Sequence, residues 1–301
     1  MYASRAMSEI TPALYRAGSG EPLLLLHGFT GAWMHWRPLL DDLSNRYEVI
    51  APTLAGHDGG RPYPPGSPMT FAGSTDQLEG DLDELGVGSA HIVGNSMGGG
   101  LALELAKRGR ARSVVALAPA GGWTPGDGEA RRLARFFARQ MRVTRAFQSR
   151  MPAIVARPNL RRLALRDIMR RADRVPASDA VRLTQAALAC TVAERAIEAL
   201  RIDHGLTLED LDRIDCPVLL ATPQFDRVLP PERHAPRLRR EIPGVESLIL
   251  KDCGHVPMWD DTALVVRTIS EFVDRHATAG TSSTSGASGD APPVAQASTA
   301  S

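Results

Sequence analysis

The stretch that decides the fold is AHIVGNSMGGGLALELA, residues 90–106. An apolar, strand-like run comes first, a Gly-x-Ser-x-Gly pattern follows, and a helix-like run closes the stretch. A serine hydroxyl is a poor nucleophile. It must therefore stand clear of the backbone on a sharp turn between strand and helix, where Gly94 and Gly98 avoid a collision. The pattern predicts a nucleophile elbow with Ser96 at its tip.

Two further side chains complete the expected constellation, in the order serine, acid, histidine. Asp226 follows a strand-like run, Val218–Thr222, at the end where open parallel sheets place their sites. His255 follows a second such run, Ser247–Leu250, expected to be buried like the first. We expect Ser96 to attack an acyl carbon and His255 to take and return the proton. Asp226 would hold the imidazole tautomer and stabilise its cation.

An oxyanion site is expected where the leucine run Leu23–Leu26 ends in His27, Gly28 and Phe29. This loop would bring a backbone N–H close to the serine. We assign the two donors to the main-chain N–H groups of Phe29 and Met97, the latter being the residue after the nucleophile. Each such donor is typically worth about 3–4 kcal/mol of the reaction barrier. The side chains of these two residues are then available to shape an acyl pocket.

With these motifs the chain resembles the α/β-hydrolase superfamily over nearly everything from about 13 to 275. The matching pieces are Leu26-His27-Gly28, Gly56-His57, Gly94 to Gly99, Asp226 with Pro230, and Gly254-His255 with Pro257. The resemblance implies that His27 and Gly28 support the oxyanion loop and that Gly94 and Gly98 support the elbow. Thr53 departs from the family, whose members usually carry aspartate there. That position is structural, so the departure leaves the triad intact.

The proposed acid has one rival, Asp252, which lies three residues before His255 on the same loop. The resemblance implies an acid on a different loop from the histidine, which favours Asp226. The sequence disfavours an acid after the strand-like run that ends at Ala118, because residues 118–122 contain none.

The resemblance implies a hydrolase that cleaves a carboxylic ester through an acyl-enzyme. Serine at position 96 argues against haloalkane dehalogenase and epoxide hydrolase chemistry, for which relatives use aspartate. Hydrolysis of a carbon–carbon bond in ring-cleavage products is the alternative, because the elbow is similar to that of such enzymes. Their usual Gly-Pro-Gly-type loop is absent, since residues 29–33 read FTGAW. Lactonase, thioesterase and acyltransferase activities remain open on the same residues, as does a non-catalytic ligand-binding member.

Strand-like and helix-like runs alternate along the chain, which predicts an α/β fold with a mostly parallel sheet and helices on both faces. The expected strands are Ala13–Arg16, Leu23–His27, Glu48–Ala51, His91–Gly94, Val114–Ala118, Val218–Thr222 and Ser247–Leu250. The expected helices are Trp36–Leu43, Phe71–Leu85, Met97–Arg108, Pro231–Arg240 and Thr262–Arg275. We expect a hydrolase core in residues 1–122 and 207–277, an inserted helical lid in 123–206, and a disordered tail in 278–301.

The expected lid is rich in arginine. Residues 123–204 contain 17 Arg, no Lys and 8 Asp or Glu, a net charge of +9, against −8 for the rest of the chain. One interpretation is attraction of an anionic substrate. The other, which we favour, is a solvated helix face comprising Arg131, Arg132, Arg135, Arg139 and Arg142, opposite a stripe that contains Phe136 and Phe137.

Composition narrows the class of protein. A net charge of +1 gives no global reason to expect nucleic acid or a membrane surface as a partner. Three cysteines without metal-ligand spacing suggest reduced thiols and no metal site, and no motif indicates a nucleotide or another cofactor. No apolar run approaches the length of a membrane span, and the first nine residues lack a signal-like core. We therefore expect a cytoplasmic monomer or homodimer that acts on a small molecule.

Overall fold

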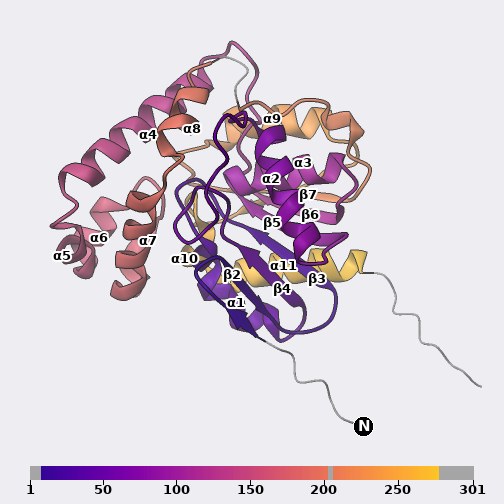
Figure 1. Ribbon diagram of the computed structural model, residues 1–301, viewed down its shortest axis with the longest axis horizontal. Coiled ribbons are helices and arrows are strands. Elements are labelled where there is room, and N and C mark those ends of the chain that lie inside the picture. The colour runs from indigo at the N-terminus through magenta and orange to yellow at the C-terminus, as the bar shows by residue number, and fades with distance from the viewer. Residues whose placement is uncertain (1–7, 203–205, 278–301) are drawn as a thin grey trace, which may run out of the picture.

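A computed structural model describes residues 8–202 and 206–277 and contains one eight-stranded sheet (Figure 1). The strand order is β1-β2-β4-β3-β5-β6-β7-β8, in which the β1–β2 and β2–β4 pairs are antiparallel and the other five pairs are parallel. The strands are β1 (Glu9–Ile10), β2 (Leu14–Ala17), β3 (Pro22–Leu26), β4 (Glu48–Pro52), β5 (Ala90–Asn95), β6 (Ala111–Leu117), β7 (Val218–Pro223) and β8 (Glu246–Leu250). The expected α/β-hydrolase fold class is confirmed.

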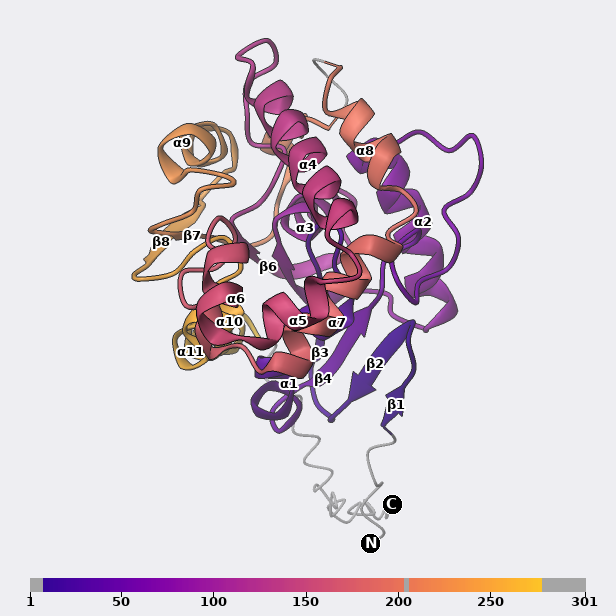
Figure 2. The same ribbon diagram turned by 90° about the vertical axis from the view of Figure 1, so that its left-hand side faces the viewer.

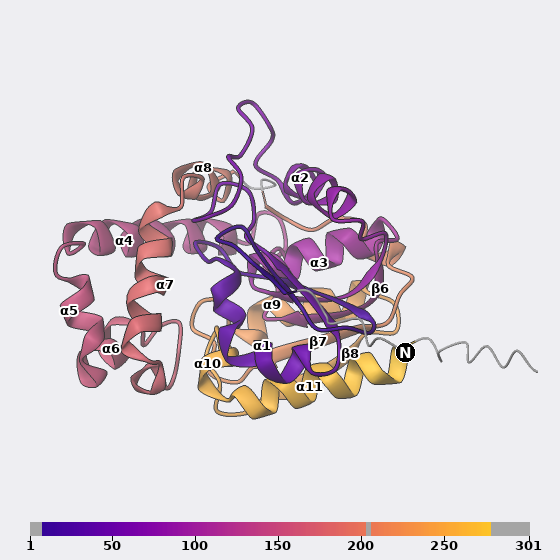
Figure 3. The same ribbon diagram turned by 60° about the horizontal axis from the view of Figure 1, so that its bottom comes forward.

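Helices cover both faces of the sheet (Figure 3). One face carries α2 (Phe71–Glu84), α3 (Met97–Lys107) and α9 (Pro231–Glu241), and the other carries α1 (Arg37–Ser44) and α11 (Thr262–His276). Alternate side chains of a strand point to opposite faces, so a strand covered on both sides must be apolar throughout. In β3, Leu24 and Leu26 belong to one core and Leu23 and Leu25 to the other, and all four are fully buried.

Five helices are inserted between β6 and β7 and lie to one side of the sheet (Figures 1 and 2). These cap helices are α4 (Glu129–Ala146), α5 (Met151–Ala156), α6 (Pro158–Ala164), α7 (Ala177–Ala189) and α8 (Ala193–Ala199). The two ends of the insertion are joined at its base. The Leu208 N–H donates to the Gly121 carbonyl at 3.0 Å, and Trp123 Nε1 donates to Thr207 Oγ1 at 2.9 Å. The chain therefore leaves the core and returns to it at one place.

The seven expected strands and the five expected core helices are present, and each end lies within three residues of the expected one. The two-residue β1 and the short α10 (Pro257–Asp260) were not expected. The expectation of a buried strand over Ser247–Leu250 is wrong for most of its length. Leu248 and Ile249 are 39% and 56% exposed, because β8 is the last strand of the sheet and has a neighbour on one side only. The predicted tail, 278–301, lies outside the described residues.

Across the described parts of the chain, 8–202 and 206–277, no helix is both long enough and apolar enough to cross a bilayer.

Candidate active site

Ser96 lies on a strained turn between β5 and α3. Its backbone angles are φ 56° and ψ −117°, a conformation that non-glycine residues rarely adopt and that is concentrated at functional sites. Strand β6 and the loop after it hold Ser96 there: its N–H donates to the Leu117 carbonyl at 2.9 Å, and its carbonyl accepts the Ala120 N–H at 2.9 Å. Ser96 therefore stands at the tip of a tight strand-to-helix turn, at the position where the sequence analysis expected an elbow.

The glycines around Ser96 are required by close backbone contacts. A Cβ at Gly94 would lie 2.1 Å from the carbonyl oxygen of Gly98, which is the collision expected from the sequence. A Cβ at Gly98 would lie equally close, 2.1 Å, to the carbonyl oxygen of Leu26 at the end of β3. The first glycine thus lets the turn close, and the second lets α3 begin against the neighbouring strand.

His255 and Asp226 are brought together from two different loops. His255 Nδ1 lies 2.7 Å from Asp226 Oδ2, and both residues are 5% exposed. The other carboxylate oxygen accepts the N–H groups of Val228 and Leu229, each at 2.8 Å, so the acid is fixed by its own loop. Asp252 is exposed, and its carboxylate lies 3.6 Å from the guanidinium of Arg170.

Asn95 holds the histidine loop against the elbow, a contact that the sequence analysis missed. Its side-chain N–H₂ donates to the main-chain carbonyl of His255 at 3.0 Å and to that of Leu117 at 3.2 Å. The residue is 1% exposed. A buried asparagine at the end of an apolar strand was the available signal, since buried amides must find hydrogen-bond partners.

Asp260, which was also missed, joins the histidine loop to the chain that follows α6. Its carboxylate accepts three backbone N–H groups, from Gly254 at 2.7 Å, Arg171 at 2.7 Å and Arg170 at 3.1 Å. The side chain is buried, and burial raises the pKa of this carboxyl. Gly254 directly precedes His255, so a carboxylate outside the cavity fixes the path of the histidine loop.

The loop after β3 runs alongside the elbow and is braced by His27. His27 Nε2 accepts the Leu54 N–H at 3.0 Å, and Nδ1 lies 2.8 Å from the Gly28 carbonyl and donates to it. Burial, reinforced by the neighbouring His57, lowers the pKa of His27, which therefore stays neutral. A Cβ at Gly28 would lie 3.3 Å from Ser96 Cβ, so only a small residue lets this loop pass so close.

The side chains of the two expected oxyanion residues point to different places. Phe29 lines the cavity at Ser96 and stacks edge to face on Phe137, with ring centroids 4.8 Å apart. Met97, the first residue of α3, lines a separate small pocket with Leu54 and Val192. Of the two side chains expected to shape an acyl pocket, only Phe29 lines the cavity that contains Ser96.

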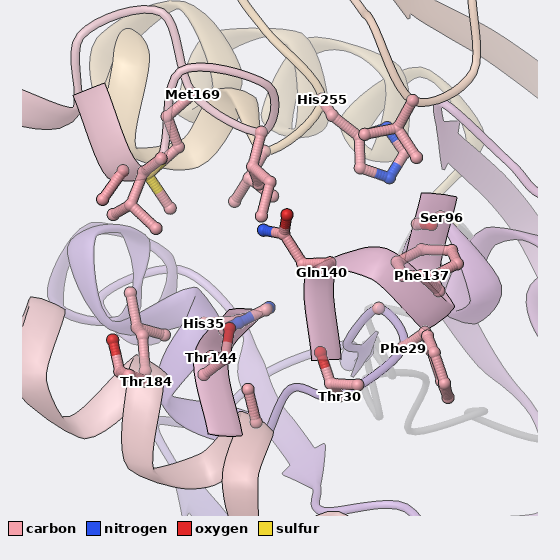
Figure 4. Close-up of a pocket in the computed structure, with 18 of the residues that line it drawn as sticks. Phe29, Thr30, His35, Ser96, Phe137, Gln140, Thr144, Met169, Thr184 and His255 are labelled. Carbon is pink, nitrogen blue, oxygen red and sulfur yellow. The ribbon is translucent and has the colours of Figure 1, made fainter. Parts of the chain in front are cut away.

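A cavity of about 120 Å³ connects Ser96 and His255 to the inner faces of the cap helices (Figure 4). Ser96, His255, Phe29 and Phe137 lie at one end of it, and Met169 and Thr184 at the other (Figure 4). Most of its lining is apolar. The polar side chains among the lining residues are Thr30, His35, Asn95, Ser96, Gln140, Thr144, Thr184 and His255.

None of the described residues that line this cavity is Arg, Lys, Asp or Glu. The His35 side chain, which is part of the polar lining, also stays neutral, because burial and the nearby His57 and His255 lower the pKa of His35 to about 4. The cavity therefore offers hydrogen bonds to a bound molecule, but no carboxylate, ammonium or guanidinium group.

The arginines of α4 point away from the cavity, as the favoured interpretation expected, with one exception. Arg131, Arg135, Arg139 and Arg142 are exposed, on the opposite side of the helix from Phe137. The prediction is wrong for Arg132, which is half-buried and donates to Glu129 at 2.7 Å and to the Val228 carbonyl at 2.7 Å. Arg132 thus ties α4 to the loop that carries Asp226.

Among residues 8–202 and 206–277, no group of three or more His, Cys, Asp or Glu side chains could hold a metal ion. The three cysteines are unpaired, and burial raises the pKa of the Cys253 thiol near His255 to about 12.

Comparison with known proteins places this chain in a family. The model of the alpha/beta hydrolase family matches residues 23–268, and the chain belongs to that family. Epoxide hydrolase EphH of Mycobacterium tuberculosis is 33% identical over 210 residues, which cover 68% of this chain and 96% of that protein. 2-Hydroxymuconate semialdehyde hydrolase of Pseudomonas sp. strain CF600 is 35% identical over 143 residues, covering 42% of this chain and 50% of that enzyme.

Solved structures agree on the fold. The naproxen esterase (carboxylesterase NP) of Bacillus subtilis superposes with a TM-score of 0.67 at 21% identity, covering 89% of this chain and 92% of the esterase. The protein is therefore a hydrolase of the alpha/beta hydrolase family, with the fold that the motifs predicted.

Proposed function

We propose that this protein is a serine hydrolase that cleaves a carboxylic ester through an acyl-enzyme on Ser96. The observation that carries the proposal is the convergence of Ser96, on its strained elbow, and His255, bonded to the buried Asp226 at 2.7 Å, at one end of a single cavity. In a neutral imidazole, an accepting carboxylate at Nδ1 keeps the proton on that nitrogen and leaves Nε2 free to act as a base.

The reaction follows from these roles. His255 Nε2 takes the Ser96 hydroxyl proton as the serine oxygen bonds to the ester carbonyl carbon, and Asp226 stabilises the resulting imidazolium. The N–H groups of Phe29 and Met97 stabilise the oxyanion. The C–O bond then breaks, and the leaving alkoxide receives the proton from His255. Water, deprotonated by the same imidazole, hydrolyses the acyl-enzyme and restores the serine.

The cavity supports an acyl group that is apolar and uncharged. A carboxylate transferred into a site without a cation loses its hydration and gains no ion pair, at a cost of several kcal/mol. An alkyl or aryl group gains about 0.8 kcal/mol for each CH₂ buried. The apolar lining of α4, α5 and α7 thus favours neutral esters over substrates that carry an acid on the acyl side.

The similarity to a protein named epoxide hydrolase does not transfer that chemistry to Ser96. Aspartate opens an epoxide to give an ester, which water can hydrolyse. A serine oxygen would give an ether, and this site has no means of breaking an ether bond. We expect an epoxide to alkylate Ser96 once or to leave it unreacted, without turnover.

Carbon–carbon bond hydrolysis is the second candidate, because the elbow resembles that of such enzymes and a 2-hydroxymuconate semialdehyde hydrolase is among the relatives. The name of that enzyme describes a substrate that carries a carboxylate. The uncharged lining of the present cavity supports the ester proposal instead.

A fluorophosphonate probe tests the proposal directly, because it bonds only to an activated serine. We expect labelling of the full-length protein, none in Ser96→Ala, and full labelling in the matched control Ser247→Ala on the edge strand β8. Hydrolysis of p-nitrophenyl acetate, butyrate and octanoate should follow the same pattern. Absence of labelling in the folded parent protein would favour a non-catalytic binding member, and labelling that survives Ser96→Ala would remove this serine from the mechanism.

A further inference from the structure

The outer face of the cap helices carries an unusual concentration of one charge. Residues 130–166 contain eleven Arg and no Lys, Asp or Glu. This segment runs from α4 through α6, which lie together on the side of the molecule away from the sheet (Figures 1 and 2). One arginine of this segment, Arg161, does not contribute to the outer face, because it is buried and donates to the carbonyls of Val155, Ala172 and Asp173.

Most of the remaining arginines point into solvent. Arg139, Arg142, Arg150 and Arg157 are exposed, and none of them has an acidic partner within 4 Å in the described parts of the chain. Since the chain outside 123–204 has a net charge of −8, the molecule is strongly polarised, with its positive end at the cap helices. This end will turn toward an anionic surface.

Large apolar side chains are exposed among these arginines. Val143, Phe147, Leu160 and Leu163 are 45%, 44%, 38% and 58% exposed. They are four of the nine large apolar side chains that are exposed in residues 8–202 and 206–277, although they come from a stretch of 21 residues. Exposed apolar side chains concentrated in one short stretch of the chain are typical of an interaction surface. We call these four residues and the exposed arginines between 139 and 157 the cap surface.

We propose that the cap surface docks the protein on a lipid bilayer that contains anionic lipids. Arginine on a helical surface together with Phe and Leu is the composition of segments that lie in the plane of a membrane interface. The arginines would meet lipid phosphates, while Phe147, Leu160 and Leu163 would enter the boundary between headgroups and acyl chains. A nucleic acid would engage the arginines but would leave the two leucines in water, which is why the bilayer is favoured.

The cavity lies directly under this surface. Its lining residues Gln140 and Thr144 come from α4, Met151 and Val155 from α5, and Ala164 from α6, the helices whose outer faces form the cap surface. Docking would therefore place an apolar cavity beside the phase into which apolar molecules partition. The docking proposal does not depend on which bond the enzyme cleaves.

Co-sedimentation of the full-length protein with vesicles tests the proposal without measuring activity. We expect binding to phosphatidylcholine vesicles that contain 30% phosphatidylserine, little binding to phosphatidylcholine alone, and release by 0.5 M NaCl. Each arginine near an anionic surface contributes about fivefold to the partition coefficient. The triple variant Arg139→Gln/Arg142→Gln/Arg150→Gln should therefore bind about 100-fold more weakly.

Two further variants separate the contributions. Phe147→Ser/Leu163→Ser, which keeps the charge, should weaken vesicle binding at least tenfold. The triple variant Arg46→Gln/Arg267→Gln/Arg275→Gln changes the charge equally on α11 and the turn after α1, and it should bind like the parent protein. All substituted side chains are exposed, and unchanged melting temperatures will show that the variants remain folded.

Three results would overturn the proposal. The first is no binding to anionic vesicles even at low salt. The second is an equal loss of vesicle binding in the Arg139/Arg142/Arg150 variant and in the control Arg46/Arg267/Arg275 variant, which would indicate a response to net charge alone. The third is full binding by Phe147→Ser/Leu163→Ser together with equally tight binding to duplex DNA, which would identify a general polyanion surface instead of a bilayer surface.

Discussion

Replacing Asp226 by asparagine should separate catalysis from folding. The carboxylate accepts the His255 Nδ1–H through one oxygen and two backbone N–H groups through the other. In the asparagine variant, the amide oxygen can keep both backbone bonds while the N–H₂ group faces Nδ1. His255 must then accept at Nδ1 and carry its proton on Nε2, so it presents a donor to Ser96 where a base is needed.

The expected loss of activity is large. Where the acid of a serine–histidine–acid triad is replaced by its amide, kcat falls about 10⁴-fold. At about 1.36 kcal/mol per factor of ten, this is a barrier increase of about 5.4 kcal/mol. The stability loss should be smaller, about 2 kcal/mol, because two bonds to a charged acceptor become bonds to a neutral one.

Asp226→Ala provides the contrast. Alanine leaves the N–H groups of Val228 and Leu229 buried without an acceptor, at about 1–3 kcal/mol each. The free energy of unfolding should then fall by about 2–6 kcal/mol, a large part of the 5–15 kcal/mol typical of a domain. The Asp226→Asn and Asp226→Ala variants should therefore have similar activities but different free energies of unfolding.

Asp260→Asn is the matched control, because Asp260 is also a buried carboxylate but does not touch the imidazole. Its three N–H donors meet two oxygens, so an amide must leave at least one donor facing an N–H₂ group. We expect a stability loss of about 1–3 kcal/mol and an activity loss of no more than about 10²-fold, through displacement of the histidine loop.

The assay combines kcat/KM on p-nitrophenyl butyrate with urea unfolding for all three variants. The reasoning is refuted if Asp226→Asn retains activity within tenfold of the parent protein. It is equally refuted if Asp260→Asn loses more activity than Asp226→Asn while staying more stable, since the acid would then have been misassigned.

Three other outcomes are expected. Gly94→Ala should lower the free energy of unfolding by about 4 kcal/mol or more, because its Cβ would meet the Gly98 carbonyl at 2.1 Å; urea unfolding near that of the parent would contradict the turn geometry. Burial lowers the pKa of His57 and His234 to about 4 from the ordinary 6.5, so stability should be complete above pH 6.5 and fall by about 3 kcal/mol per histidine as the pH drops from 6.5 to 4. Unfolding curves that coincide at pH 7.5 and 4.5 would exclude this. Ala187→Phe should narrow the cavity and lower kcat/KM for the octanoate ester at least about tenfold more than for the acetate, and an equal effect on both esters would place the acyl group elsewhere.

The sheet could be predicted because its signals are local. Four consecutive leucines in β3 can only be accommodated where both faces are covered, and the glycine–serine turn fixes the junction of β5 and α3. The exposure of β8 could not be predicted in the same way. Its apolar run looks like that of β7, and only the strand order shows that β8 lies at an edge.

Residues of the candidate site could be predicted where their side-chain chemistry suggests a role. They could not be predicted where their role depends on contacts that form only in the folded chain. Ser96, Asp226 and His255 are conspicuous because few side chains can act as nucleophile, acid and base. Asn95 and Asp260 have no such signature, because their partners are backbone groups of a loop about 160 residues away in one case and of the cap connection in the other. Contacts of this kind depend on the folded path of the chain, which residue type alone does not encode.

The cap helices and the chain that connects them are hydrogen-bonded to the two loops that carry Asp226 and His255. Arg132 of α4 donates to the carbonyl of Val228, two residues after the proposed acid, and Asp260 binds both Gly254 and the chain after α6. The Val256 N–H also donates to the Ile168 carbonyl at 3.0 Å. A rigid displacement of the whole cap would break these bonds and disturb the acid and the histidine together. None of these contacts involves α5 or the end of α4, so the cap is tied to the two loops at its base and not at its outer helices.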